Sequence, residues 1–343
     1  MANPANTLYA GPIMITGKTI FITGASGFVG RNLLEALWQQ GANTIHIMAR
    51  PASDVAYLQD QEGHIHRGTL HEPEFLKQSI PLNCDLVFHV AANTSIWRKQ
   101  AQEQIKDNWD GTKNIVEACL SQGVKRLVHV SSIAAYDCSQ GVLNEKSEQL
   151  GAVSASSYAF SKYKAEEEVR AGIAKGLDAV IVNPAHVLGP YDRGNWVRMF
   201  KMVSENKLPG IPSGKGSFAD ARQVAQGVLA AAQKGGVGEN YILGGPNLTF
   251  LELVTHMGRL LDQKVPTSTI PDWLMTVVGF GKEFVANFTN KVPDITPQGV
   301  KHAISQATID DTKAQQELGY THTPIETLLQ DTIDWLRQTQ QIK

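Results

Sequence analysis

Two side chains with acid–base potential lie one helical turn apart in segment 157–176, whose pattern predicts a helix. Tyr158 and Lys162 are separated by four residues, so both side chains lie on one face of that helix. A free tyrosine has a pKa of about 10, and a neighbouring ammonium group favours the phenolate and lowers this pKa. We therefore expect Lys162 to tune Tyr158 for proton transfer near neutral pH. By itself, a tyrosine–lysine pair at this spacing is commonly only a helix surface.

A hydroxyl group from another part of the chain can complete this pair. Ser132 follows the predicted strand 125–130, and its hydroxyl can hold a substrate carbonyl against Tyr158. Lys162 can in addition hold the ribose hydroxyls of a bound dinucleotide. Such a set moves a proton, but reduction of a carbonyl also requires a cofactor that supplies a hydride. The elements that bind this cofactor must lie elsewhere in the sequence.

The stretch from Thr19 to Gly30 predicts a loop that binds phosphate groups. A short strand is followed by three glycines at a spacing of three and then by an apolar helical pattern. This layout leaves the N–H groups at the start of the helix available to a pyrophosphate. Gly24 can adopt a positive φ, Gly27 leaves the backbone open to the ligand, and Gly30 lets the helix pack closely. The spacing is one residue longer than Gly-x-Gly-x-x-Gly, and a glycine-rich turn without a ligand is the weaker alternative. The predicted cofactor contacts of this loop are Gly24, Ser26, Gly27, Phe28, Val29 and Gly30.

The residue that follows the second predicted strand, 44–48, bears on the choice of cofactor. An NAD-binding fold commonly has an acidic residue about 20 positions after the last glycine of the phosphate-binding turn. This residue accepts a hydrogen bond from the ribose 2′-hydroxyl. Arg50 stands at this position. A guanidinium group cannot accept that hydrogen bond, but it pairs with a 2′-phosphate. The sequence therefore favours NADP(H) over NAD(H), with a solvated loop arginine as the alternative.

Strand and helix patterns alternate along the first half of the chain with short connections. Further strands are predicted at 64–67, 85–90 and 125–130. This alternation predicts an α/β fold with a parallel, doubly wound sheet of Rossmann type. Ligands of such sheets lie at the carboxyl ends of the strands. The residues that follow the predicted strands, and that we therefore expect near the ligand, are Gly24, Arg50, Ala91, Ala92 and Ser132.

Composition disfavours several functional classes. A net charge of −2 over 343 residues gives no electrostatic case for binding nucleic acid or an anionic membrane. Three widely spaced cysteines and the lack of metal-ligand spacing among the histidines predict no metal site and favour a reducing cytoplasm. No apolar run reaches the roughly 20 residues that span a bilayer. We therefore expect a cytoplasmic protein that acts on a small molecule, without nucleic-acid or membrane partners, and a homodimer is an open alternative.

Several motifs together resemble the extended short-chain dehydrogenase/reductase superfamily, in the NAD-dependent epimerase/dehydratase family. TGASGFVG, VSSIAAY and YAFSK carry the resemblance, and FHVAANTSIW, IVNPAHVLGP and KAQQELGY fit it over nearly the whole chain. The chain is most similar to the dihydroflavonol-reductase-like branch. The resemblance implies a catalytic serine, tyrosine and lysine, which correspond here to Ser132, Tyr158 and Lys162. It also implies a catalytic asparagine on the long helix, which corresponds to Asn108.

The resemblance implies further cofactor contacts and a second domain. Pro184 and Val187 correspond to the loop beside the nicotinamide. Family members usually carry Gly-Asp-Leu after the third strand, with the aspartate facing the adenine. Here Thr69 and Leu70 follow the glycine, which implies a weaker adenine contact. The implied fold is a Rossmann-type domain with a smaller C-terminal substrate-binding domain.

The second half of the chain is less regular, and substrate identity depends on it. We predict an N-terminal extension at 1–17, a dinucleotide-binding domain at 18–182, and a mainly substrate-binding domain at 183–343 from which some segments return to the sheet. Three residues are candidates for the lining of the substrate pocket, although ordinary packing explains each equally well. They are Trp97, His186 and Tyr191.

Two other features of this half leave alternatives open. Arg193 and Arg198 can hold an anionic group such as the pyrophosphate of a nucleotide sugar, or they can be surface charges. The segment 271–288 is rich in large apolar residues and predicts an amphipathic helix. It can pack as a pocket wall, which is our default, form a dimer face or lie on a membrane. Its few basic residues make the membrane interpretation the weakest.

Three functions fit these patterns. The leading hypothesis is an NADP(H)-dependent oxidoreductase that transfers a hydride between nicotinamide and a ketone or secondary alcohol. The alternative is a nucleotide-sugar epimerase that uses the same residues through a transient keto intermediate. A non-catalytic redox sensor that binds NADP(H) is a second alternative, which the presence of Tyr158 and Lys162 disfavours. Sugar dehydratases carry an acidic pair after the catalytic hydroxyl residue, whereas apolar residues follow Ser132 here, so dehydration is disfavoured.

Overall fold

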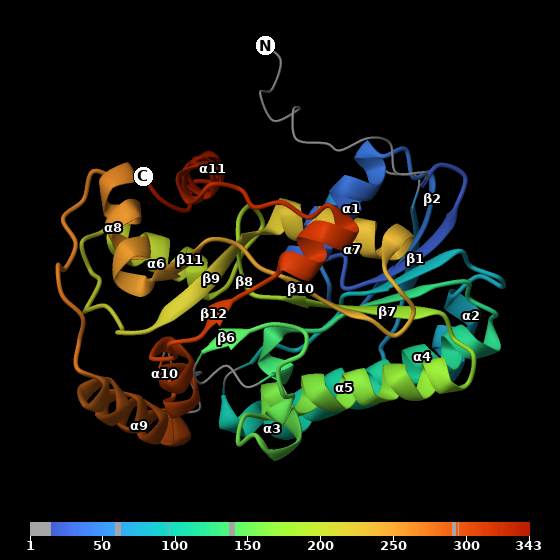
Figure 1. Ribbon diagram of the computed structural model, residues 1–343, viewed down its shortest axis with the longest axis horizontal. Helices are drawn as coiled ribbons and strands as arrows, with labels where there is room; N and C mark the ends of the chain where they lie inside the picture. The colour runs from blue at the N-terminus through green and yellow to red at the C-terminus, as the bar shows by residue number, and fades with distance from the viewer. Residues whose placement is uncertain (1–14, 59–62, 96, 137–140, 290–292, 294) are drawn as a thin grey trace, which may run out of the picture.

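The chain folds around a central sheet whose strands are β1 (Thr19–Thr23), β2 (Thr44–Ala49), β3 (Gly63–Arg67), β4 (Leu86–His89), β5 (Leu127–Val130), β7 (Ala179–Pro184) and β10 (Asn240–Leu243). The computed structural model describes residues 15–58, 63–95, 97–136, 141–289, 293 and 295–343. The strand order is β10–β7–β5–β4–β1–β2–β3, and every neighbouring pair is parallel (Figure 1). The predicted extension at 1–17 falls mainly outside the described residues, as does Cys138.

Helices cover both faces of this sheet (Figure 1). Those on one face are α1 (Phe28–Gln39) and α7 (Ala221–Lys234), and those on the other are α2 (Pro73–Ser79), α4 (Gly111–Ser121) and α5 (Ser157–Ala174). Successive side chains of a strand point to opposite faces. Ile20 and Ile22 of β1 therefore lie in the core with α1 and α7, whereas Phe21 lies in the core with α2, α4 and α5. The doubly wound parallel sheet that the sequence predicts is confirmed.

The long helix that carries Asn108 contains a π-helical turn in its middle. It consists of α3 (Ala101–Ile105), the turn Lys106–Asp110, and α4. A π turn admits one extra residue into the helix and is frequent at functional sites. Asn108 lies in this turn and is buried. The turn therefore sets the direction in which Asn108 faces.

A smaller set of elements from the second half packs above one end of the sheet (Figure 1). It contains the strands β8 (His186–Leu188), β9 (Lys215–Asp220) and β11 (Asn247–Thr249), and the helices α6 (Asn195–Ser204), α8 (Phe250–Leu260) and α11 (Ile325–Gln338). The strand order is β11–β9–β8. Phe200, Phe218 and Leu253 belong to its core. Nearby, β6 (Val142–Leu143) pairs in parallel with β12 (Thr308–Ile309). These strands are too short to give a clear alternating pattern, so the sequence did not predict them.

The apolar segment 271–288 forms α9 (Asp272–Thr289), which packs against α10 (Pro297–Ala303). Our default expectation was that its large apolar side chains pack against the protein. This expectation is wrong for most of them, because side chains such as Phe284 and Phe288 are exposed to solvent. None of the helices within the described residues is long and apolar enough to cross a membrane.

Candidate active site

The glycine-rich turn between β1 and α1 is shaped so that side chains would not fit in it. Gly24 has a φ of +77°, and a Cβ there would lie 2.5 Å from the Ala91 nitrogen. A Cβ on Gly30 would lie 2.0 Å from the Gly24 carbonyl oxygen. Gly27 caps α1, and in the described structure neither a side-chain cap nor an acidic residue occupies the first turn. The start of α1 thus offers N–H groups to an anion, and the turn fits a dinucleotide pyrophosphate.

The ends of β2 and β3 form the adjacent part of this edge. Arg50 is exposed directly after β2. The Arg67 guanidinium donates to the carbonyl oxygens of Arg50, Pro51 and Ser53 at 3.0–3.2 Å and so orders the loop that carries Arg50. The sequence predicts a 2′-phosphate at Arg50, and the charge of its guanidinium group would complement that phosphate.

The two residues predicted at the adenine side follow β3. The backbone N–H and hydroxyl of Thr69 both donate to the Glu72 carboxylate, at 2.7 and 2.9 Å. The side chain of Leu70 packs against Gly111 of α4, where a Cβ would lie 2.9 Å from its Cδ1. This turn is therefore held by its own contacts.

Ser132 and Tyr158 come together across the interface between β5 and α5. Ser132 caps the short 3₁₀ turn after β5 by accepting from the Ala134 N–H at 3.2 Å. It also forms a hydrogen bond with Tyr158, near the first turn of α5. Burial raises the pKa of Tyr158, and the hydrogen bond from Ser132 opposes this rise. We expected Lys162 to lower the pKa of Tyr158. In the structure this pKa is raised instead, because desolvation outweighs the favourable contact.

Lys162 lies one helical turn after Tyr158 on α5, with 2% of its surface exposed. Its Nζ donates to the Val130 carbonyl oxygen at 2.9 Å. Burial lowers the pKa of Lys162 to about 8, while the charge of Glu166, one turn further along, acts in the opposite direction. The ammonium is therefore the main form at neutral pH and is lost a little above it.

Glu166 is fully buried and joins several elements. Its carboxylate accepts from the Ser131 hydroxyl at 2.5 Å, from Asn183 at 2.6 Å and from Asn240 at 3.0 Å. Ser131 directly follows β5, Asn183 lies near the end of β7, and Asn240 is the first residue of β10. Ser131 is thereby directed into the protein, whereas Ser132, its neighbour, lies at Tyr158.

Asn108 links the π turn to α5. Its Oδ1 accepts from the Asn93 N–H at 2.7 Å, and its Nδ2 donates to the Asn93 carbonyl and to the Ser161 hydroxyl, both at 2.9 Å. These contacts fix the chain after β4 against the helix that carries Tyr158. The structure thus shows Asn108 holding this loop, and its predicted catalytic role stays a prediction.

A cavity of about 460 Å³ opens beside Ser132 and Tyr158. Of the predicted substrate residues, His186 lines it, as does Val187. Trp97 and Tyr191 are not among its described lining residues, and neither are Arg193 and Arg198. The cavity is lined by Thr94, Ser132, Ile133, Ala134, Tyr158, Ala185, His186, Val187, Trp196, Met199, Lys215, Gly216, Ser217, Phe250, Gln298, Gly299, His302, Ala303, Ser305, Ala307 and Ile309.

The two excluded aromatic residues have other contacts. Tyr191 packs edge-on against Trp335, and the Arg31 guanidinium lies 4.2 Å from its ring centre. Trp97 is buried at the start of the turn before α3.

Comparison with known proteins identifies the family. The sequence matches the profile of the NAD dependent epimerase/dehydratase family over residues 20–244. This chain belongs to that family. A protein of Synechocystis sp. named "Putative dihydroflavonol 4-reductase" is 30% identical to it, over 94% of this chain and 96% of the other.

Two solved structures of similar proteins share the fold. The crystal structure of gox2253 has a TM-score of 0.82 and 27% identity, and covers 95% of this chain and 100% of its own. A nucleoside-diphosphate-sugar epimerase from Pseudomonas aeruginosa has a TM-score of 0.78 and 23% identity, and covers 96% of this chain and 100% of its own. The family thus includes reductase-named and epimerase-named proteins, and its name states the dependence on NAD that the glycine turn fits.

Several aromatic residues around His186 were not singled out from the sequence: Trp196 and Phe250, which line the cavity, and Phe218, which packs against His186. The His186 ring stacks on Phe218 at 5.6 Å and meets Trp196 edge-on at the same distance. Phe250 contacts the same group. Burial lowers the pKa of His186 to about 4, so the ring is neutral at pH 7. These residues come from β8, α6, β9 and α8. The sequence around each of them does not predict that their side chains come into contact. Glu166 did have a signal, because it follows Tyr158 and Lys162 at the same spacing of four.

Proposed function

We propose that this protein is an NADP(H)-dependent oxidoreductase that interconverts a ketone and a secondary alcohol. One observation carries the proposal: the hydrogen-bonded hydroxyls of Ser132 and Tyr158 lie at the wall of a cavity, and the buried Lys162 lies one helical turn after Tyr158 on α5. A bound nicotinamide supplies the hydride. The glycine turn at the start of α1 fits the pyrophosphate of the same cofactor.

The chain's own residues then account for the proton. In reduction, the Ser132 hydroxyl donates to the substrate carbonyl and holds it next to Tyr158. Tyr158 donates its proton to the oxygen as the hydride reaches the carbon, and Lys162 stabilises the resulting phenolate. The raised pKa of Tyr158 in the free protein keeps the phenol protonated at neutral pH, as an acid must be. Alcohol oxidation uses the same groups in reverse.

The cavity lining favours a reductase over a nucleotide-sugar epimerase. Most of the described lining residues are apolar or small. Lys215 is the one among them that is charged at neutral pH, because burial lowers the pKa of both lining histidines, His186 and His302. A nucleotide diphosphate requires cationic or backbone partners, and the predicted candidates Arg193 and Arg198 are not among the lining residues. The substrate class that fits is an apolar ketone or secondary alcohol. The exposed Arg50 supports NADP(H) as the preferred cofactor.

The test is the variant Tyr158→Phe, which removes the acid and keeps the ring. We expect NADPH binding, followed by nicotinamide fluorescence, to stay within about twofold, and ketone reduction to fall by about 10²–10⁴-fold. Tyr163→Phe is the matched control, because Tyr163 lies on the same helix and donates to Glu167 instead. Normal turnover by Tyr158→Phe would refute the assignment. A wild-type protein that binds NADPH but converts neither ketones nor UDP-sugars would support the redox-sensor alternative.

A further inference from the structure

Helix α9 carries its large apolar side chains on the side that faces away from the protein. Trp273, Val277, Phe280, Phe284 and Phe288 recur every three or four residues, so they form one continuous stripe along the helix. We call these five residues the apolar stripe. Their exposed fractions lie between 57% and 75%. An amphipathic helix normally buries such a stripe, and here it is left uncovered.

The opposite side of α9 is fitted closely to the protein. Gly279, Glu283 and Ala286 are buried on that side. A Cβ on Gly279 would lie 3.1 Å from Cγ2 of Val300 and 3.3 Å from the Pro297 nitrogen, so α9 and α10 approach each other closely. The orientation of the helix is therefore fixed by packing, and the stripe cannot turn inward without breaking this contact.

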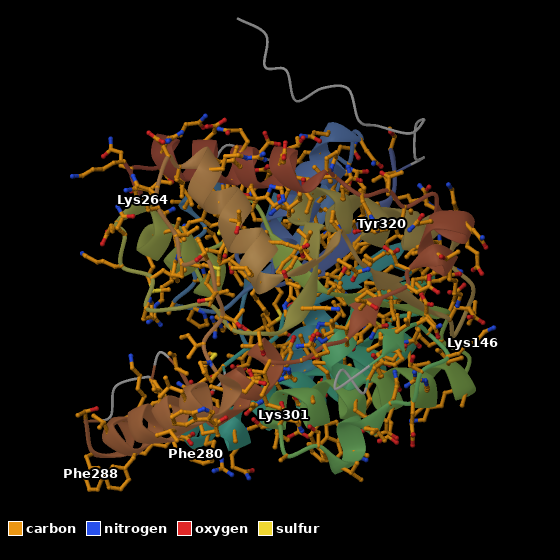
Figure 2. The ribbon with its side chains drawn as sticks, turned by 60° about the vertical axis from the view of Figure 1, so that its left-hand side comes forward. Lys146, Lys264, Phe280, Phe288, Lys301 and Tyr320 are labelled. Carbon is orange, nitrogen blue, oxygen red and sulfur yellow. The ribbon has the colours of Figure 1, made fainter. Side chains whose placement is uncertain are left out.

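The position of α9 suits contact with an extended surface. The helix lies at the periphery of the molecule, and Phe280 and Phe288 point outward from it (Figures 1 and 2). The stripe itself contains no ionisable side chain. Lys282 on α9 and Lys301 on α10 are exposed, as is Asp272 at the start of α9, whereas Glu283 is buried. Exposed apolar side chains on a helix whose own surface and neighbouring helix each present a lysine complement an anionic lipid bilayer, into whose interface an amphipathic helix inserts.

A second copy of the chain is a less suitable partner for this helix. A stable protein interface takes about 20–30 residues from each side. The exposed large apolar residues of α9 are the five of the stripe with Leu274, Val278 and Val285. This narrow ridge is small for such an interface, but a fluid bilayer adapts to it.

The stripe is connected to the cavity through α10. One side of α10 packs on α9, and Gln298, Gly299 and His302 on the same short helix line the cavity. We propose that α9 docks on an anionic lipid surface, and that the substrate is a lipophilic ketone or alcohol that partitions into that surface. The second part rests on the proposed oxidoreductase function. The sequence analysis ranked membrane contact last because basic residues are few. The exposure and arrangement of the apolar side chains, which only the structure reveals, reverse that ranking for surface contact.

Vesicle flotation tests the docking surface without cofactor or substrate. The wild-type chain is mixed with phosphatidylcholine vesicles that contain about 30% phosphatidylglycerol, or none. The test variant combines Phe280→Ser, Phe284→Ser and Phe288→Ser, and the control is Leu82→Ser, whose side chain is 72% exposed far from α9 in the sequence. We expect the wild type and the control to float with the anionic vesicles, less with neutral ones, and the triple variant to bind at least tenfold more weakly. Because the replaced side chains are exposed, its thermal unfolding should be unchanged.

The opposite results overturn the docking proposal. These are a wild type that does not bind vesicles, or a triple variant that binds as well as the wild type. A wild-type dimer that becomes a monomer in the triple variant, without vesicle binding, would show that a second copy covers the stripe.

A separate activity assay tests the substrate class. A long-chain ketone embedded in the vesicles is compared with a short water-soluble ketone in vesicle-free buffer. We expect the triple variant to lose at least tenfold in kcat/KM for the embedded ketone only. Equal rates for the two proteins on the embedded ketone would refute delivery from the bilayer. If the wild type reduces neither ketone, the proposed function fails, and flotation still decides the docking surface.

Discussion

At the scale of single residues, burial determines the ionisation of the proposed catalytic groups more than neighbouring charges do. Desolvation raises the pKa of Tyr158 and lowers that of Lys162. The sequence indicated the chemistry of both residues, because their spacing is visible. It could not indicate that desolvation outweighs the hydrogen bond from Ser132 at Tyr158 and the charge of Glu166 at Lys162, because desolvation depends on the surrounding fold.

The Lys162 ammonium predicts a pH limit for ketone reduction. Its pKa is lowered to about 8, so the charged form is present below this pH and is lost as the pH rises through it. We expect kcat/KM for ketone reduction, which reports the free enzyme, to fall above about pH 8. Glu166 opposes the shift, so Glu166→Gln should move this fall to lower pH. A profile that stays level to about pH 10 would contradict the role of Lys162.

Arg50 predicts the cofactor preference. If its guanidinium pairs with the 2′-phosphate, Arg50→Asp removes an attraction and adds a repulsion for NADPH only. We expect NADPH affinity to fall by about tenfold or more, since a hydrogen bond to a charged group contributes about 1.5–3 kcal/mol, and NADH affinity to change little. Fluorescence titration of both cofactors measures this. An equal loss of affinity for NADPH and NADH would contradict the proposed contact between Arg50 and the 2′-phosphate.

At the scale of elements, close packing of the backbone explains why particular glycines are required. The turn after β1 admits no Cβ at Gly24 or Gly30, whereas Gly281 on α9 has no heavy atom within 4 Å of its would-be Cβ. The long elements of the first half were predictable, because each carries a clear period and a start or stop signal. The exposed orientation of α9 was not, since a helical period does not tell which side meets the protein.

Two glycine-to-alanine variants test this difference. Gly30→Ala places a methyl group against the Gly24 carbonyl oxygen, so we expect a loss of stability of about 1–3 kcal/mol and weaker NADPH binding. Gly281→Ala adds a methyl group on an exposed helix position, which should raise stability by up to about 1 kcal/mol. Denaturant unfolding followed by circular dichroism measures both. Equal effects of the two substitutions would show that the contact at Gly30 is not restrictive.

At the scale of the whole molecule, the cavity is assembled from segments distant in sequence. The strand ends of the sheet could be predicted to converge, because parallel strands share one edge. The aromatic group around His186 and the wall from α10 could not, because no local pattern records which short strands and helices of the second half come together. The substrate side of the site therefore became visible only in the folded chain.

The return of β10 to the sheet has a consequence for protein engineering. Asn240 on this strand donates hydrogen bonds to both Glu166 and Asn183. The late part of the chain therefore helps to hold the Glu166 carboxylate, one helical turn after Lys162. A chimera that exchanged everything after position 182 would also exchange this support. Recombination aimed at new substrates should therefore graft only the segments that form the cavity and retain the parental edge strand.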